Sequence, residues 1–250
     1  MMRIALRISG ATYRYNQPLR NFDFNSFQTM RNHYEQFGLG TKTGIDLPFE
    51  ASGVIGTNPQ AGNLLHLSFG QYDAYTTLQL AQYVATIAND GYRVRPRLVK
   101  EIRAPGSNEG EIGPVVDSFE PEVLNKVGVE EKYIKRVQDG FRRVYTSGTA
   151  ANQWRGFPYP MAGKTGTAEN PQYVVENGKV VKTTHTENLT LVGYAPYDNP
   201  EMAFAVVVPK NGTSRTRNQI HHNIGKRITE AYFDLKNGEQ QIQDDDKEEE

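Results

Sequence analysis

The second half of the chain carries a run of extended segments, and this run sets the strongest limit on the fold. Asn177-Gly178 stands between Tyr173–Val175 and Val180-Val181, and Asn-Gly readily takes the positive φ angles of a type I′ hairpin turn. Two strongly apolar segments follow at 189–194 and 202–208. Because connections this short join antiparallel neighbours, the pattern predicts an antiparallel sheet.

Helices are predicted on both sides of this run, from apolar residues at helical spacing. Thr76 and Gln79 fit a capping box that would start the second of these helices. The apolar positions are Phe27, Met30, Tyr34 and Phe37; Leu80, Val84, Ile87 and Ala88; Ile134, Val137, Phe141 and Val144; and, along one stripe of the last helix, Ile220, Ile224, Ile228, Ala231 and Leu235. Residues 1–8 read as the tail of a further amphipathic helix. Helices packed on an antiparallel sheet make an α/β (α+β) fold.

Composition excludes several classes of function. A formal net charge of -1 over 250 residues argues against a nucleic-acid-binding protein. No apolar run approaches membrane-spanning length, so we expect no membrane segment in this chain. The absence of Cys excludes disulfides and thiolate chemistry. The charge run 244–250 predicts a solvated, disordered end.

The stretch Met161–Glu169 holds the best candidate site. Successive side chains of a strand point to opposite faces, so Lys164 and Gly166 would share one face, and Thr165 and Thr167 the other. Gly166 would let a ligand or another chain lie against the backbone. A cation, two hydroxyls and a row of backbone N–H groups suit the binding of an acyl donor. A similar triplet, Lys42–Gly44, runs into Ile45–Pro48 and predicts only a loop that enters a turn.

An ordered set of motifs gives the chain a family resemblance. The chain resembles the C-terminal part of the transpeptidase domain of a class B penicillin-binding protein, within the penicillin-recognising serine transferases. The segments that carry the resemblance are Phe37–Gly40, Thr43–Pro48, Ser68–Gln71, Thr77–Ala81, Ala88–Gly91, Gly163–Glu169 and Val192–Pro196. The resemblance implies a β-lactamase/transpeptidase-like fold without its N-terminal strands and nucleophile helix. We assign residues 1–236 to this domain portion and 237–250 to an acidic disordered tail.

The resemblance also implies a role for each residue of the motif. The family contains peptidoglycan D,D-transpeptidases, which bind penicillin and cross-link cell-wall stem peptides through a serine acyl-enzyme, without a metal or cofactor. Lys164 would support the protonation state and the field of the catalytic centre. Thr165 and Thr167 would bind the carboxylate of a D-Ala-D-Ala stem peptide or a β-lactam. The Thr167 N–H would be an oxyanion donor, and Gly166 would keep the strand open. Lys164 and Thr167 are therefore the expected catalytic residues.

The sequence departs from the family at the nucleophile. None of its serines is followed by Lys three residues later, and no S-x-N occurs; Tyr197–Asn199 fits only a looser pattern within a turn. We expect a chain that starts just past these motifs and is inactive alone. It would need the upstream part of the same protein or a complementary chain, without which strand 202–208 would have an open edge. By resemblance, it would work on the extracytoplasmic face of a bacterial cell membrane, with an anchor outside this chain.

Other readings of the sequence stay open. Within the family, the chain could be a relative of β-lactamases or β-lactam sensors. From another class, it could be a non-catalytic substrate-binding or assembly module. A metal site is disfavoured because His33, His66 and His185 are scattered, and the adjacent His221-His222 pair on a helix cannot face one ion together. Trp154 reads as packing, although it is close enough to the motif to rim a cleft.

Overall fold

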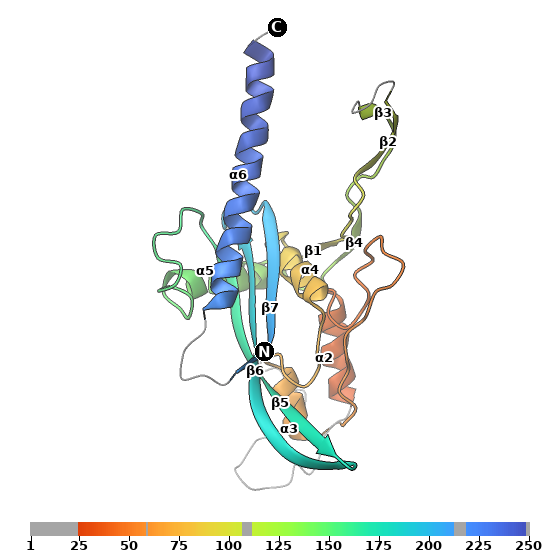
Figure 1. Ribbon diagram of the computed structural model, residues 1–250, viewed down its shortest axis with the longest axis vertical. Coiled ribbons are helices and arrows are strands. Elements are labelled where there is room, and N and C mark those ends of the chain that lie inside the picture. The colour runs from red at the N-terminus through yellow and green to blue at the C-terminus, as the bar shows by residue number, and fades with distance from the viewer. Residues whose placement is uncertain (1–24, 59, 107–111, 213–218, 249–250) are drawn as a thin grey trace. The chain divides into compact units, whose positions relative to one another are not determined.

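A computed structural model describes residues 25–58, 60–106, 112–212 and 219–248 (Figure 1). The helix predicted over residues 1–8 lies outside them. The elements are α2 (Asn25–Glu35), α3 (Ala61–Leu67), α4 (Thr77–Ala88), β1 (Tyr92–Val94), β2 (Glu101–Pro105), β3 (Ile112–Ser118), β4 (Val123–Lys126), α5 (Glu131–Thr146), β5 (Ala162–Glu176), β6 (Lys179–Ala195), β7 (Met202–Gly212) and α6 (Ile220–Glu248). The chain divides into two compact units, Met1–Thr86 with Gly91–Val129, and Ile87–Asp90 with Glu130–Glu250.

The first unit holds α2, α3, most of α4 and two small antiparallel sheets, β1–β4 and β2–β3. Its best-packed cluster joins α2 to α3 through buried apolar side chains, Phe27, Met30, Leu64 and Leu67. The predicted capping box is confirmed at the start of α4. The backbone N–H of Thr76 donates to Gln79 Oε1 at 2.9 Å, and that of Gln79 donates to Thr76 Oγ1 at 3.2 Å.

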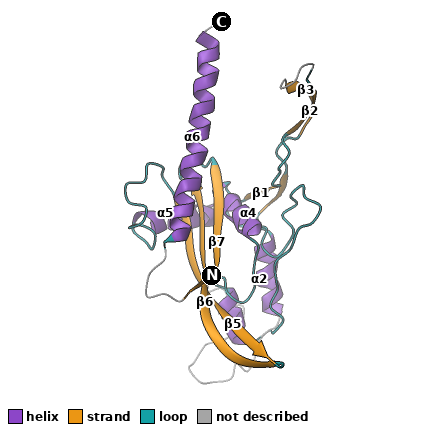
Figure 2. Ribbon diagram, viewed as in Figure 1, coloured by secondary structure: helices purple, strands orange, loops and turns teal. Residues whose placement is uncertain are grey.

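The second unit contains the predicted antiparallel sheet, in the order β5-β6-β7 (Figure 2). Asn177 and Gly178 have φ angles of 48° and 76°, which confirms the predicted hairpin between β5 and β6. Buried side chains from the sheet, from α5 and α6 and from the loop before β5 form the core; they include Tyr145, Trp154, Leu191, Phe204 and Phe233. The mixed fold with helices on an antiparallel sheet is the one that the sequence predicts.

The apolar stripe of α6 lies on a face that the described residues leave open. Ile220, Ile224 and Ile228 are 41%, 37% and 38% exposed, and Leu235 is 70% exposed. The buried positions of the helix are instead His221, His222, Gly225, Thr229 and Phe233. The expectation that apolar spacing marks the face packed on the sheet was therefore wrong for this helix.

Close packing at Gly225 explains the orientation of α6. An ideal Cβ on Gly225 would lie 2.8 Å from Leu191 Cδ2 and 3.0 Å from Phe204 Cε2. The helix backbone thus approaches the sheet closely, and a larger residue at position 225 would require Leu191 and Phe204 to shift. The small and polar residues one turn on face the same way. Beyond residue 236, where we place the domain boundary, the structure continues α6 as helix to Glu248.

Candidate active-site strand

The motif lies on β5, at one edge of the three-stranded sheet. Lys164 pairs with Val192, and Gly166 pairs with Thr190, both on β6. Among the described strands, none pairs with the other side of β5. The backbone there can accept an extended peptide as an added strand.

The four motif residues differ in exposure and in their partners. Lys164 and Thr167 are exposed, whereas Thr165 and Gly166 are half-buried. The Lys164 ammonium donates to the backbone oxygen of Thr165 at 2.6 Å. The hydroxyls of Thr165 and Thr149 share a hydrogen bond at 2.9 Å, so the loop after α5 fixes one hydroxyl of the motif. The strand therefore presents a cation and a hydroxyl to its surroundings.

Two glycines of β5 allow close contact between β5 and β6. An ideal Cβ on Gly166 would lie 2.1 Å from Thr190 Oγ1. Gly163, which we did not single out, is tighter: its ideal Cβ would lie 2.0 Å from the Val192 carbonyl oxygen. Because that neighbour is backbone, a side chain at Gly163 must displace the strand itself. Only its position just before the motif could have indicated this role.

The first Lys-Thr-Gly triplet has a structural task within the first unit. The N–H groups of Thr43 and Gly44 donate to the two carboxylate oxygens of Glu50, at 2.6 and 3.2 Å. Burial alone would raise the pKa of Glu50, but these hydrogen bonds and the charge of Lys42 lower it overall. Thr43 is buried, and the segment is a loop, as predicted.

Tyr197 and Trp154 each make a side-chain hydrogen bond within the second unit. The Tyr197 hydroxyl donates to Asp139 at 2.8 Å in the turn after β6. Trp154 is 5% exposed, and its Nε1–H donates to His222 Nδ1 at 2.8 Å. Sequence reasoning missed this link, because residues so far apart leave no local pattern. Trp154 also lines a pocket, whose lining does not include Lys164.

Two other kinds of site are absent from the described residues. Among them, no group of three or more His, Cys, Asp or Glu side chains could hold a metal ion. Within the same residues, no helix combines the length and the apolar character needed to cross a bilayer.

Comparison with known proteins places this geometry in a family. The penicillin binding protein transpeptidase domain family matches residues 4–230. The chain belongs to this family, and more narrowly its relatives are class B penicillin-binding proteins. It is 49% identical to penicillin-binding protein 2A and 45% identical to penicillin-binding protein H, both of Bacillus subtilis, over 94% of its own length.

A solved relative supports the same placement. Penicillin-binding protein 2B from Streptococcus pneumoniae superposes with a TM-score of 0.80 at 34% identity, over 94% of this chain and 37% of that one. The chain spans 32% of the length of each of the two Bacillus relatives. The resemblance read from the motifs is thereby confirmed.

Proposed function

We propose that this chain is the substrate-binding part of a peptidoglycan D,D-transpeptidase that also binds β-lactams. The observation that carries the proposal is the Lys164–Thr167 segment, with Lys164 and Thr167 exposed, on an edge of β5 that no described strand occupies. An anionic peptide end laid along this edge would meet a cation, hydroxyls and backbone N–H groups together. Family membership supports D-Ala-D-Ala stem peptides as the substrate class.

Each residue of the motif has a task in this proposal. Lys164 supplies positive charge at the catalytic centre, and Thr165 and Thr167 bind the substrate carboxylate. The Thr167 N–H stabilises the oxyanion that forms when a serine attacks the peptide carbonyl; one such donor lowers the barrier by roughly 3–4 kcal/mol. Gly166 keeps the strand surface low enough for the substrate backbone.

The serine itself must come from polypeptide that this sequence does not supply, because no S-x-x-K occurs in it. Two features of the described residues support such a partner. Ile224 and Ile228 of α6 are more than a third exposed, and β7 pairs with β6 alone among the described strands. The partner in the proposal is therefore the upstream part of the same protein or a complementary chain. We place the assembled enzyme on the extracytoplasmic face of the bacterial membrane.

A chimera tests the proposal. This chain would be fused behind the upstream transpeptidase segment of Bacillus subtilis penicillin-binding protein 2A and exposed to a fluorescent penicillin. We expect covalent labelling of the chimera and none of the chain alone. Lys164→Met should slow labelling by roughly 100-fold, whereas Lys42→Met, in the structural triplet, should leave it unchanged.

Two results would count against the proposal. One is a chimera that unfolds cooperatively yet takes no label. The other is equal labelling of the Lys164→Met and Lys42→Met variants. If the folded chimera takes no label while the unfused chain binds a stem peptide at equilibrium, and Thr165→Ala abolishes that binding, the chain is a non-catalytic binding module.

A further inference from the structure

The loop that follows α5 carries a threonine that contacts the motif strand. Thr149 is exposed, and its hydroxyl oxygen lies 2.9 Å from that of Thr165. Either oxygen can be the donor in this hydrogen bond. Among the described residues, neither hydroxyl makes a second hydrogen bond. Since each hydroxyl has one proton to donate, the pair keeps one proton that the chain itself does not use.

Backbone contacts hold Thr149 on the end of α5. The N–H of Gly148 donates to the Arg143 carbonyl oxygen at 2.8 Å. The N–H of Ala150 donates to the Val144 carbonyl oxygen at 3.0 Å, and Ala150 is fully buried. Gly148 is also tightly placed, because an ideal Cβ on it would lie 2.8 Å from Val144 Cα. Both chain neighbours of Thr149 are therefore fixed to the helix.

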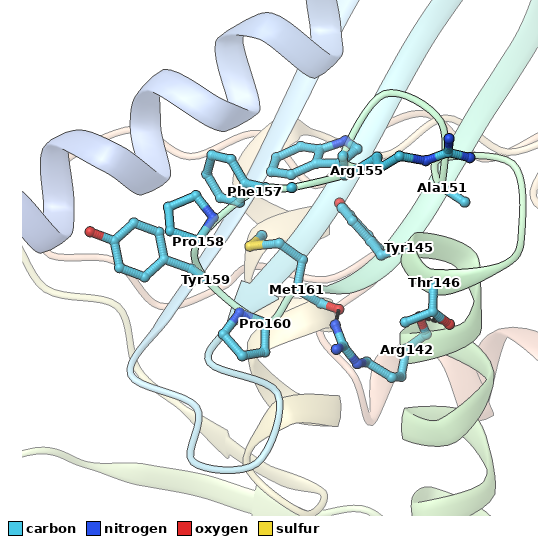
Figure 3. A pocket seen from close by; sticks show the side chains of 12 residues that line it. Arg142, Tyr145, Thr146, Ala151, Arg155, Phe157, Pro158, Tyr159, Pro160 and Met161 are labelled. Carbon is cyan, nitrogen blue, oxygen red and sulfur yellow. Dashed lines mark hydrogen bonds between the residues drawn. The ribbon is translucent and has the colours of Figure 1, made fainter.

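A side-chain hydrogen bond ties the end of α5 to the start of the motif strand. Arg142 Nη1 donates to the Met161 carbonyl oxygen at 2.9 Å (Figure 3). Met161 is 2% exposed and directly precedes β5. Figure 3 also shows Thr146 on the last turn of α5, close to Arg142. The contact between Thr149 and Thr165 thus joins two segments whose spacing is already set by another contact.

The direction of the hydrogen bond decides whether Thr165 can bind an anion. A carboxylate only accepts hydrogen bonds, so a hydroxyl that binds it must donate its proton. If Thr165 donated to Thr149, this proton would be used. If Thr149 donates instead, the Thr165 proton is free for the ligand, and the two successive hydrogen bonds strengthen each other. Thr167 lies two residues on, about 6.6 Å along the strand, so one carboxylate can accept a hydrogen bond of about 2.7 Å from each motif hydroxyl.

We propose that Thr149 is a positioning residue for the recognition of the substrate carboxylate. It donates to Thr165 and so directs the Thr165 proton toward the anionic end of the substrate. Because Thr149 acts through Thr165, it does not itself touch the reacting atoms. This inference rests on the proposed function, and it adds to that function a residue outside the Lys164–Thr167 motif. Thr149 should therefore matter for a substrate with a free carboxylate and not for the neutral counterpart.

Two matched thioester substrates test this in the chimera with the upstream transpeptidase segment. Both are N-acyl-D-alanyl thioesters, and the leaving group is thioglycolate in one and thioglycolamide in the other. The ratio of their kcat/KM values measures recognition of the carboxylate. Thr149→Val keeps the shape of the side chain but removes the hydroxyl, and it should lower this ratio by about 3–10-fold. Thr149→Ser keeps a hydroxyl and should keep the ratio within about 2-fold of the unsubstituted chimera.

Further variants show whether Thr149 acts through Thr165. Thr165→Val should also lower the ratio, and adding Thr149→Val to it should lower the ratio no further. Thr146→Val is the matched control, because Thr146 is an exposed threonine of α5 whose hydroxyl donates to the Arg142 carbonyl oxygen at 3.3 Å. It should leave the ratio unchanged. In the chain alone, chemical denaturation should show that the losses of stability in Thr149→Val and Thr165→Val are less than additive.

The failure of this inference can be told apart from the failure of the proposed function. An unchanged ratio in Thr149→Val, in a chimera that still takes the penicillin label, would overturn the role of Thr149 alone. An equal loss of kcat/KM for both thioesters would also overturn it, because a merely structural role affects both substrates. Additive losses of stability in the chain alone would show that the two hydroxyls do not interact. A folded chimera that takes no label would overturn both proposals.

Discussion

One buried hydrogen bond joins α6 to the loop before the motif strand. His222 Nδ1 accepts the indole N–H of Trp154, so this nitrogen must be unprotonated. Burial, and then the neighbouring His221 and Lys226, lower the pKa of His222 from 6.5 to about 4. The folded state therefore favours neutral His222, and the bond depends on pH.

Stability should fall on acidification because of this residue. Well above pH 6.5 His222 is neutral in both the folded and the unfolded state, and its contribution to stability is complete. Between about pH 6.5 and 4, His222 becomes protonated in the unfolded chain but stays neutral in the folded chain. The free energy of unfolding therefore decreases as the pH falls. Denaturant titrations across this pH range should show that the free energy of unfolding decreases less in His222→Phe than in the unsubstituted chain. The exposed His185 is the control, and His185→Gln should keep the full decrease; equal slopes in all three proteins would contradict the assignment.

Gly163 should be the least replaceable residue of the motif region. Gly163→Ala places a methyl group against the Val192 carbonyl, and we expect it to lower the free energy of unfolding by about 2 kcal/mol or more. Gly140→Ala is the matched control: its ideal Cβ meets nothing within 4 Å, and alanine should add about 0.5–1 kcal/mol in a helix. Chemical denaturation measures both. Similar effects of the two substitutions would show that β5 relaxes away from β6.

At the scale of the element, the sequence predicts those turns and helix starts whose conformation depends on residues adjacent in the chain. The Asn177-Gly178 turn and the Thr76–Gln79 capping box were predicted from neighbouring residues and are present. The β2–β3 hairpin was not predicted, because its strands are exposed and carry little alternation. Lys164 and Thr167 are exposed on the predicted strand, but their roles depend on the family resemblance.

The orientation of α6 could not be predicted from its periodicity. Apolar residues at helical spacing indicate a face that packs against other protein, but they do not identify which element or chain covers that face. Contact with the sheet is decided instead at Gly225, where the backbone approaches Leu191. Only the three-dimensional structure separates the two faces.

The two faces of α6 should respond differently to mutation. The double substitution Ile224→Gln and Ile228→Gln should change the free energy of unfolding of the chain alone by less than about 1 kcal/mol, since both side chains are more than a third exposed. Phe233→Ala should cost about 3 kcal/mol or more, because Phe233 is 7% exposed within the core. A large loss of stability in the double variant would mean that the stripe is already covered.

At the scale of the whole molecule, the chain divides into two compact units, and the assignment of residues 1–236 to one domain portion stays a prediction. Each unit has apolar side chains buried within it. Sequence alone could not locate this division, because Ile87–Asp90 at the end of α4 belongs to the second unit while the rest of α4 belongs to the first.

The chain should associate with itself when it is alone in solution. Within the described strands β7 pairs on one side only, and an apolar edge invites pairing with another chain. We expect sedimentation velocity to show concentration-dependent association, which Val207→Lys on β7 should reduce. The control Val123→Lys, at an exposed residue of the first unit, should have no such effect. A monomer at all concentrations would argue that the edge is protected.

The unequal lengths of the strands have a consequence for motion. β6 pairs with β5 from Lys179 onward, but with β7 only from Thr186. The outer part of the β5–β6 hairpin is therefore a two-stranded ribbon, and ribbons of this kind are marginally stable in water. Its amides should exchange with solvent sooner than those around Lys164, so fraying that begins at the turn stops before it reaches the strand end that would hold the substrate.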